Sequence, residues 1–168
     1  MKKYLIFCSA IIIANIILFS AFSFKENNMQ INQALINTEE IFHFVVNQYI
    51  RNKDEFPTEE YKQNIISNGY MIGQLSRQNQ SKMFVSKYKK NVLSDCDYFF
   101  QVIFHEMGTP ARNKLAYDSI EKISKEIRKI TSNKKGIFDT LNISQEGYEE
   151  IHNIILEYEN TVKKLPKE

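Results

Sequence analysis

The chain has 168 residues, 43% of them hydrophobic and 25% charged, which is typical of a folded globular protein and too apolar for a disordered one. Its formal net charge is +2, and without Lys2 and Lys3 the 20 remaining basic side chains equal the 20 acidic ones. A neutral domain lacks the long-range field that attracts DNA or RNA, so we expect no nucleic-acid partner. Five glycines and three prolines are few, which favours long helices over strands and turns.

An uncharged apolar run, residues 4–24, follows the two lysines at the start of the chain. A helix of that length is about 31 Å long, close to the thickness of the hydrocarbon core of a bilayer. The positive-inside rule keeps the lysines in the cytoplasm and carries the rest of the chain across the membrane. The length of the run favours an uncleaved anchor. Ala21-Phe22-Ser23 favours the alternative, a signal peptide that is cleaved after Ser23.

We therefore divide the chain into residues 1–23, a signal peptide or N-terminal membrane anchor, and residues 24–168, an extracytoplasmic helical domain. An uncleaved chain is expected in the inner membrane, facing the periplasm or the cell exterior. A cleaved chain is expected to be periplasmic or secreted. The predicted fold class is all-α, with an N-terminal hydrophobic helix followed by a compact bundle of about five helices.

The first two helices of the bundle are predicted from apolar residues at steps of three and four. The first covers about residues 29–53 and is stopped by Pro57, which cannot continue a helix. The second covers residues 58–78. Asn68-Gly69 lies in its middle and is expected to kink or split it, because glycine is a weak helix former.

The third helix is predicted over residues 81–107, beginning after Ser81. Its stretch 98–104 is apolar nearly all round, so this helix needs neighbours on more than one side. Gly108 is expected to end it, and Thr109-Pro110 supplies a cap and a first-position proline for the next helix.

The last two helices, residues 110–132 and 144–165, each carry an apolar stripe at alternating steps of three and four. The first interpretation is that both stripes pack into the core of one bundle. The alternative is that they pair two chains, as heptad stripes do in coiled coils. Residues 133–143 between these helices are predicted to be mainly loop.

No metal motif is found in the sequence. His105-Glu106 resembles the start of a zinc-protease motif, but the position where the second histidine should stand is Thr109. His43 and His152 lie on other predicted helices, and no spacing favours a shared ion. We predict no metal ligands and no cofactor.

No catalytic motif is found either. Cys96 stands between Asp95 and Asp97, whose charges raise the pKa of a thiol and weaken it as a nucleophile. Because a strongly apolar run follows it, we expect Cys96 to be buried. The few glycines form no phosphate-binding loop. We therefore predict no catalytic or cofactor-binding residues, and the protein is more simply explained as a binding protein than as an enzyme.

Charge is unevenly distributed along the chain. Residues 81–135 hold 12 basic and 6 acidic side chains, whereas residues 144–168 hold 3 basic and 6 acidic ones. One interpretation is that the two parts complement each other within the fold, and the other is that the basic part binds an acidic partner. The candidate partner-binding residues are Lys82, Lys87, Lys89, Lys90, Lys122, Lys125, Arg128 and Lys129.

The first functional hypothesis is an exported or membrane-tethered bacterial envelope protein that binds another protein. One version is an immunity or inhibitor-type protein that neutralises an exported toxin or hydrolase, by analogy of size and architecture alone. The alternative is a self-associating membrane-anchored sensor or envelope assembly component, which predicts homodimers. A third hypothesis is a hydrolase with an unrecognised site, which would require loss of activity in His105→Ala.

Overall fold

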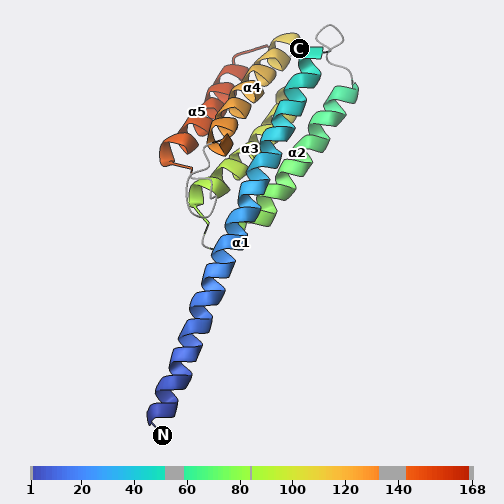
Figure 1. The fold of residues 1–168 in the computed structure, drawn as a ribbon. Coiled ribbons are helices and arrows are strands. Elements are labelled where there is room, and N and C mark those ends of the chain that lie inside the picture. The colour runs from blue at the N-terminus through green and yellow to red at the C-terminus, as the bar shows by residue number, and fades with distance from the viewer. Residues whose placement is uncertain (1, 52–58, 84, 133–142, 167–168) are drawn as a thin grey trace.

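The computed structural model describes residues 2–51, 59–83, 85–132 and 143–166, and these ranges contain helices and short connections but no strand. The described helices are α1 (Lys2–Arg51), α2 (Glu59–Gln80), α3 (Lys87–Glu106), α4 (Pro110–Ser132) and α5 (Gln145–Val162) (Figure 1). The predicted all-α fold, with an apolar N-terminal helix and a packed bundle, is confirmed.

The helix α1 joins the N-terminal apolar segment to the bundle without a break (Figure 1). Its 50 residues make a rod about 75 Å long. The sequence predicted a separate helix near residue 29, but residues 24–31 contain no glycine or proline that would end the rod. Asn28 adds to its continuity by donating from its side chain to the Phe24 carbonyl oxygen, at 2.9 Å.

Burial, rather than a helix end, marks the boundary between the two halves of α1. Phe19 and Phe22 in the lower half are 69% and 66% exposed, whereas Leu35 and Phe42 in the upper half are fully buried. Among the described residues, α1 is the helix long and apolar enough to cross a membrane, and a signal sequence meets the same criterion. The lower half is therefore compatible with either a signal sequence or a membrane anchor.

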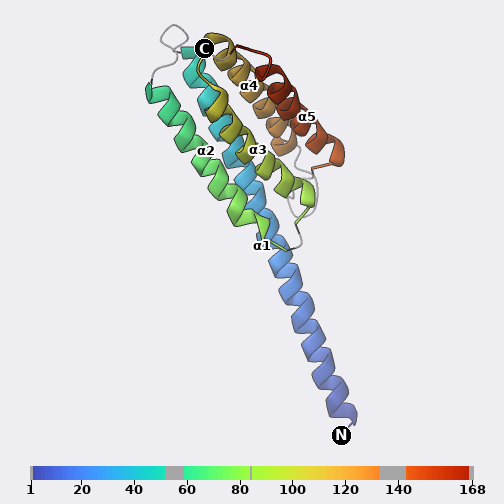
Figure 2. The same ribbon diagram turned by 180° about the vertical axis from the view of Figure 1, so that it is seen from behind.

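The helices alternate in direction, so that α2 and α4 run back toward the end where α1 enters the bundle while α3 and α5 run away from it (Figures 1 and 2). The three residues between α3 and α4 and the six between α2 and α3 are too few for anything but a reversal of direction. The helix α3 contacts α1, α2 and α5, and α4 contacts α1 and α5. The prediction that residues 98–104 need several neighbours is met by these three partners of α3.

The centre of the core is a group of aromatic rings from three helices. Phe42 of α1 lies edge-on to Phe100 of α3, with ring centroids 5.0 Å apart, and Phe99 meets Tyr158 of α5 in the same way at 5.2 Å. Edge-to-face pairs of this kind stabilise a core beyond the area they bury. The stripes of the last two helices complete the core, in which Ile120, Ile123, Ile127, Ile151, Ile155, Tyr158 and Val162 are at most 2% exposed.

The burial of those two stripes confirms that they pack within one chain. They are therefore not available to pair two chains, and any self-association must use another surface.

The starts of α4 and α5 follow the sequence prediction. Pro110 begins α4 with Thr109 as its cap, whose hydroxyl accepts from the Arg112 backbone N–H at 3.3 Å. Ser144 caps α5 in the same manner, accepting from Gly147.

The third helix begins six residues later than predicted. The helix α2 continues to Gln80, and α3 starts at Lys87 with Ser86 as its cap rather than Ser81. The Ser86 hydroxyl accepts from the Tyr88 backbone N–H at 3.3 Å. The predicted break at Pro57 and the loop over 133–142 lie outside the described residues.

Gly69 does not kink or split α2, contrary to the sequence prediction, because the helix is continuous through it. A Cβ atom at position 69 would lie only 3.2 Å from the Cβ of Phe100, and one at position 73 would lie 2.9 Å from a carboxylate oxygen of Asp97. The two glycines are one turn apart on the same side. They let α2 and α3 approach more closely than any side chain would allow.

This close approach predicts opposite effects of one substitution at two glycines. Gly147→Ala in α5, where a Cβ would have ordinary contacts, should stabilise the protein by about 0.5–1 kcal/mol through helix propensity. Gly69→Ala should lose that gain and destabilise the protein by about 1 kcal/mol, because Phe100 must shift. Urea unfolding of the full chain in detergent, followed by circular dichroism, measures both. Equal stabilisation by the two alanines would show that Gly69 has no packing role.

Candidate interaction surface

The histidines of the protein do not form a shared site. Within the described ranges, no three His, Cys, Asp or Glu side chains group in a way that could hold a metal ion. His43 is exposed on α1, and His105 is exposed near the end of α3, where its ring contacts Phe104. His152 lies on α5 and has a different partner.

His152 and Asp95 form an acid–base pair that the sequence did not reveal. The imidazole Nδ1 lies 2.8 Å from Asp95 Oδ2, and the Tyr148 ring stacks on the imidazole with centroids 5.6 Å apart. Burial, together with the nearby Asp95 carboxylate, raises the pKa of Tyr148. A carboxylate that orients a histidine also occurs in hydrolases, but no Ser, Thr or Cys is hydrogen-bonded to His152 among the described residues. The pair joins α3 to α5.

Cys96 is buried, as the sequence predicted, with none of its surface exposed. Burial raises the pKa of its thiol far above the usual value, and the Asp95 and Asp97 charges add to this shift. A thiol of this kind is a packing group and not a nucleophile.

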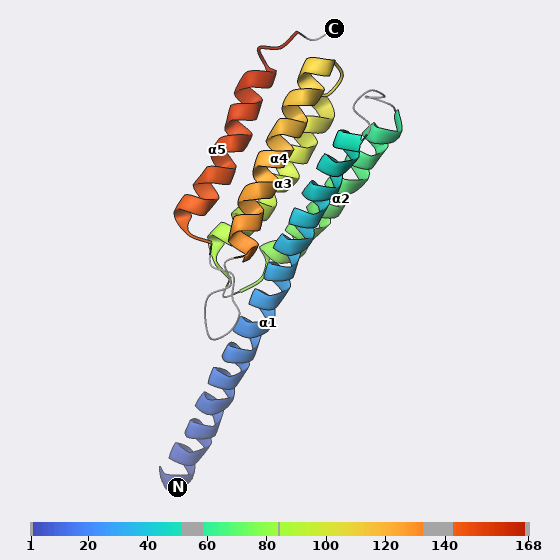
Figure 3. The same ribbon diagram turned by 45° about the horizontal axis from the view of Figure 1, so that its top comes forward.

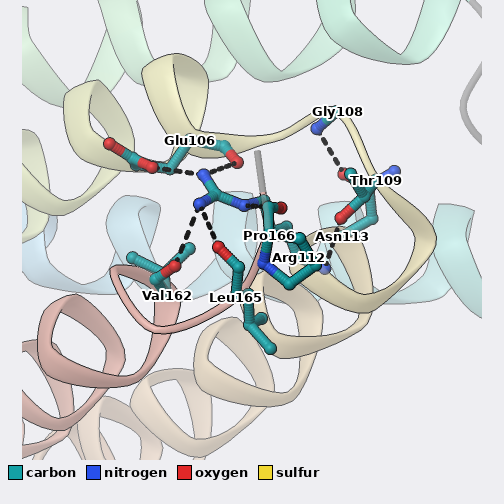
Figure 4. Close-up of polar contacts among 8 residues, drawn as sticks. All are labelled: Glu106, Gly108, Thr109, Arg112, Asn113, Val162, Leu165 and Pro166. Carbon is teal, nitrogen blue, oxygen red and sulfur yellow. Dashed lines mark hydrogen bonds and ion pairs between the residues drawn. The ribbon is translucent and has the colours of Figure 1, made fainter. Parts of the chain in front are cut away.

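Glu106 takes part in a polar cluster centred on Arg112, at the end of the bundle away from the N-terminal apolar segment (Figure 4). The Arg112 side chain is 4% exposed, and its Nη1 lies 2.5 Å from Glu106 Oε2. Its three nitrogens also donate to the main-chain carbonyls of Glu106, Val162, Leu165 and Pro166, at 2.7–3.3 Å. Glu106 and Val162 are the last residues of α3 and α5, and Leu165 and Pro166 follow α5, so one guanidinium binds the chain at both helix C-termini.

The Arg112 cluster predicts that Arg112 contributes more to the stability of the protein than the exposed basic residues of α4. Arg112→Met should destabilise the protein by about 3 kcal/mol, because four main-chain carbonyls lose a donor and the partly buried Glu106 carboxylate loses its ion pair with Arg112. The control is Lys122→Met on the same helix, whose exposed ion pair with Glu157 at 3.7 Å should be worth less than about 0.5 kcal/mol. Urea unfolding in detergent measures both variants, and similar losses would contradict a special role for Arg112.

The predicted basic residues of α4 each have an acidic partner. The pairs are Lys122–Glu157, Lys125–Glu121, Arg128–Glu39 and Lys129–Glu126, with shortest N–O distances of 3.7, 2.6, 2.8 and 2.5 Å. Lys122–Glu157 joins α4 to α5, as expected if residues 81–135 complement residues 144–168, whereas Arg128–Glu39 joins α4 to α1 and the other two pairs lie within α4. All four basic side chains are at least half exposed, so each pair contributes little to stability. That they bind a partner stays a prediction.

The predicted basic residues of 82–90 lie between the end of α2 and the first turn of α3, at the end of the bundle where α1 enters it and α4 finishes (Figure 3). Lys82 donates to the Gln30 side chain, and Lys90 donates to the Gln80 carbonyl at 2.8 Å. The Lys87 ammonium lies 5.1 Å from the centre of the Tyr88 ring. Each of these lysines thus has a contact within its own chain, and their role in binding also stays a prediction.

Lys89 differs from the other candidate residues because it is buried, with 2% of its surface exposed. Its ammonium donates to the side-chain oxygens of Asn28 and Asn32 on α1, at 3.3 and 2.8 Å. Burial lowers its pKa to about 8. Lys89 thus ties α3 to α1 from inside and does not lie on a surface that a partner can contact.

The lowered pKa of Lys89 predicts a pH dependence of stability. The unfolded chain holds this proton up to its ordinary pKa of 10.5, whereas the folded chain releases it near pH 8. The unfolded state therefore binds more protons between these values, and the Lys89 contribution to the free energy of unfolding rises with pH, by about 1–2 kcal/mol from pH 8 to 10.

The measurement is urea unfolding of the wild type and of Lys89→Met at both pH values. The difference between the two proteins is the readout, because Cys96 and several tyrosines with raised pKa values act in the opposite direction. Parallel changes in the two proteins would show that Lys89 keeps an ordinary pKa in the fold.

A groove of about 480 Å³ lies between α1 and α2. Its floor includes Ile41, which is 8% exposed, and its edges are Phe44 and Met71, which are 50% and 52% exposed. The remaining lining residues are mostly side-chain amides, namely Asn37, Asn68, Gln74 and Gln78, with Glu40 and Leu75. Apolar edges beside groups that both donate and accept hydrogen bonds can hold a polypeptide.

Sequence reasoning missed this groove. Phe44 lies in a helix with many apolar residues, and nothing in the periodicity separates it from core residues such as Phe42. One sequence signal could have identified Phe44 as exposed: Phe42, Val45 and Val46 already form the buried side of α1, and Phe44 lies on another face.

No family model, no curated protein and no solved structure matches the chain. The fold and its surface define the class: an all-helical bundle whose first helix continues into an exposed apolar N-terminal segment.

Proposed function

We propose that this is a membrane-anchored bacterial envelope protein that binds another protein in the groove between α1 and α2. Residues 4–24 form the membrane anchor, and the bundle stands on the extracytoplasmic side. The observation that carries the proposal is that α1 supplies both the apolar segment and one wall of the groove. The groove is thereby held at a fixed position relative to the membrane.

The height of the groove favours a protein over a lipid as its ligand. The residues of α1 that line the groove, from Asn37 to Phe44, lie 13–20 residues beyond Phe24, the last residue of the apolar run 4–24. Along a continuous helix that is about 20–30 Å, well above the level of lipid head groups. A partner must therefore reach this height from the membrane or from solution.

The lining of the groove favours an amphipathic helix as the bound segment. Phe44 and Met71 provide exposed apolar contacts, and aromatic and methionine side chains are enriched where proteins bind one another. Glu40 is the charged residue among those that line the groove. A partner helix with apolar residues on one face and a lysine or arginine at its edge fits this surface.

An immunity or inhibitor-type role is one form of this proposal, in which the partner is an exported toxin or hydrolase. Its support is the absence of catalytic motifs in the sequence and the presence of a groove, together with analogy of size and architecture. The groove by itself does not favour a toxin over any other helical partner. Identification of the partner therefore decides the function.

Replacing Phe44 or Met71, the two edges of the groove, should strongly reduce recovery of the partner. Full-length protein with a C-terminal tag is expressed in its own host, lightly cross-linked, purified from the envelope and analysed by mass spectrometry. We expect one stoichiometric protein partner, recovered at least about tenfold less with Phe44→Asp or Met71→Asp, as for an interface hot spot. Leu156→Asp on α5, where Leu156 is 42% exposed outside the groove, is the control. Equal recovery from all three variants would place the partner elsewhere.

A further inference from the structure

Asn15 is the amide residue of the apolar segment, residues 4–24, and lies near its middle. Its side-chain Nδ2 donates to the Ile11 carbonyl one turn earlier, at 2.9 Å. Among the described residues no donor reaches its side-chain oxygen, and the side chain is exposed. The hydrocarbon core has no water that could satisfy this amide, and asparagines in membrane helices are satisfied by hydrogen bonds to a neighbouring helix.

The face of α1 that carries Asn15 remains uncovered where the helix enters the bundle. Gln33 is 18 residues further on, which is five helical turns, so it lies on the same face, and it is exposed. Phe22 and Met29 follow Asn15 at seven and fourteen residues and are 66% and 58% exposed. Figure 1 shows one side of α1 that no other helix covers. A second helix could follow this face from Cys8 to about Gln33, below the groove residues Glu40 and Phe44, which lie on the same face 25 and 29 residues after Asn15.

We infer that a second copy of this chain packs along this face of α1, with Asn15 of each copy hydrogen-bonded to Asn15 of the other. The inference rests on the proposed anchor. Two anchored copies enter the membrane in the same orientation, so their α1 helices are parallel, and a two-fold axis along the membrane normal brings each residue of the face against itself. An asparagine side chain suits such a pairing because it both donates and accepts.

The spacing of the face supports this partner. Cys8, Asn15, Phe22 and Met29 are seven residues apart, which is the repeat of a parallel coiled coil. One buried asparagine at such a position fixes the register and the number of helices in a coiled coil. The surface differs from the stripes of α4 and α5, which are buried in the core of each chain.

Cys8 provides the test because it lies one repeat before Asn15 on the same face, while Cys96 has no exposed surface. Membranes containing the full-length protein are oxidised with copper phenanthroline and run on a non-reducing gel. We expect a disulfide-linked dimer that contains most of the protein. The matched control is the double variant Cys8→Ala with Ile6→Cys, which places the thiol at a similar depth on the opposite face and should give at least fivefold less dimer.

Asn15 is tested in the same assay. Asn15→Leu should lower the yield of Cys8-linked dimer at least threefold while leaving membrane insertion intact, and Asn15→Gln, which keeps an amide, should retain most of the dimer. No decrease with Asn15→Leu would overturn the role given to Asn15. Equal dimer yields from Cys8 and from the Ile6→Cys control would indicate random collision and overturn the pairing.

The outcomes also separate this inference from the proposed function. If no Cys8-linked dimer forms while a Phe44-dependent partner is still recovered, the pairing of two copies is wrong and the groove proposal stands. A disulfide between Cys8 and a different protein would have the same meaning. If the mature chain begins at Phe24 by intact mass, the anchor is absent and the pairing falls with it, whereas binding in the groove can still be measured.

Discussion

The continuity of α1 is the constraint on which the rest of the structure depends. The same 50-residue helix supplies the apolar segment, one wall of the aromatic core and one wall of the groove. Because no flexible residues separate these parts, a displacement of the apolar segment must move the whole bundle with it. Lys89 strengthens this coupling, since it joins α3 to Asn28 and Asn32 on the first turns of α1 that enter the bundle.

The far end of the bundle is closed by different means. The helices α3 and α5 end there, and the C-terminus of a helix leaves carbonyl oxygens without hydrogen-bond partners in the helix. Arg112 supplies donors for both α3 and α5 while its charge is balanced by Glu106. His105-Glu106, which in sequence resembles the start of a zinc-protease motif, has separate roles in the structure: the glutamate forms an ion pair with Arg112, and the histidine is exposed.

Periodicity and capping residues were sufficient to predict the helical fold, because the isoleucine stripes of α4 and α5 and the Thr109-Pro110 cap act through local rules. They failed where the outcome depends on a neighbouring helix. Gly69 appears as a helix breaker in sequence and is a close contact with Phe100 in the structure. Lys89 appears as one lysine of a basic cluster, and its burial depends on two asparagines more than fifty residues away. The groove likewise needs two helices to exist.

The two surfaces proposed for α1 share one side of the helix and lie at different heights. Glu40 and Phe44 follow Asn15 at 25 and 29 residues, which turns them no more than about 20° from its direction. Phe44 is about 30 Å beyond Phe24 along the helix, above the level of Phe22 and Met29. A dimer confined to the lower part of this side would hold two grooves at the same height, related by a two-fold axis. A partner with two helical segments, or two copies of one partner, would then bind with an effective concentration set by rigid geometry rather than by a linker. Loss of pairing in the membrane should therefore weaken capture of a bivalent partner more than that of a monovalent one.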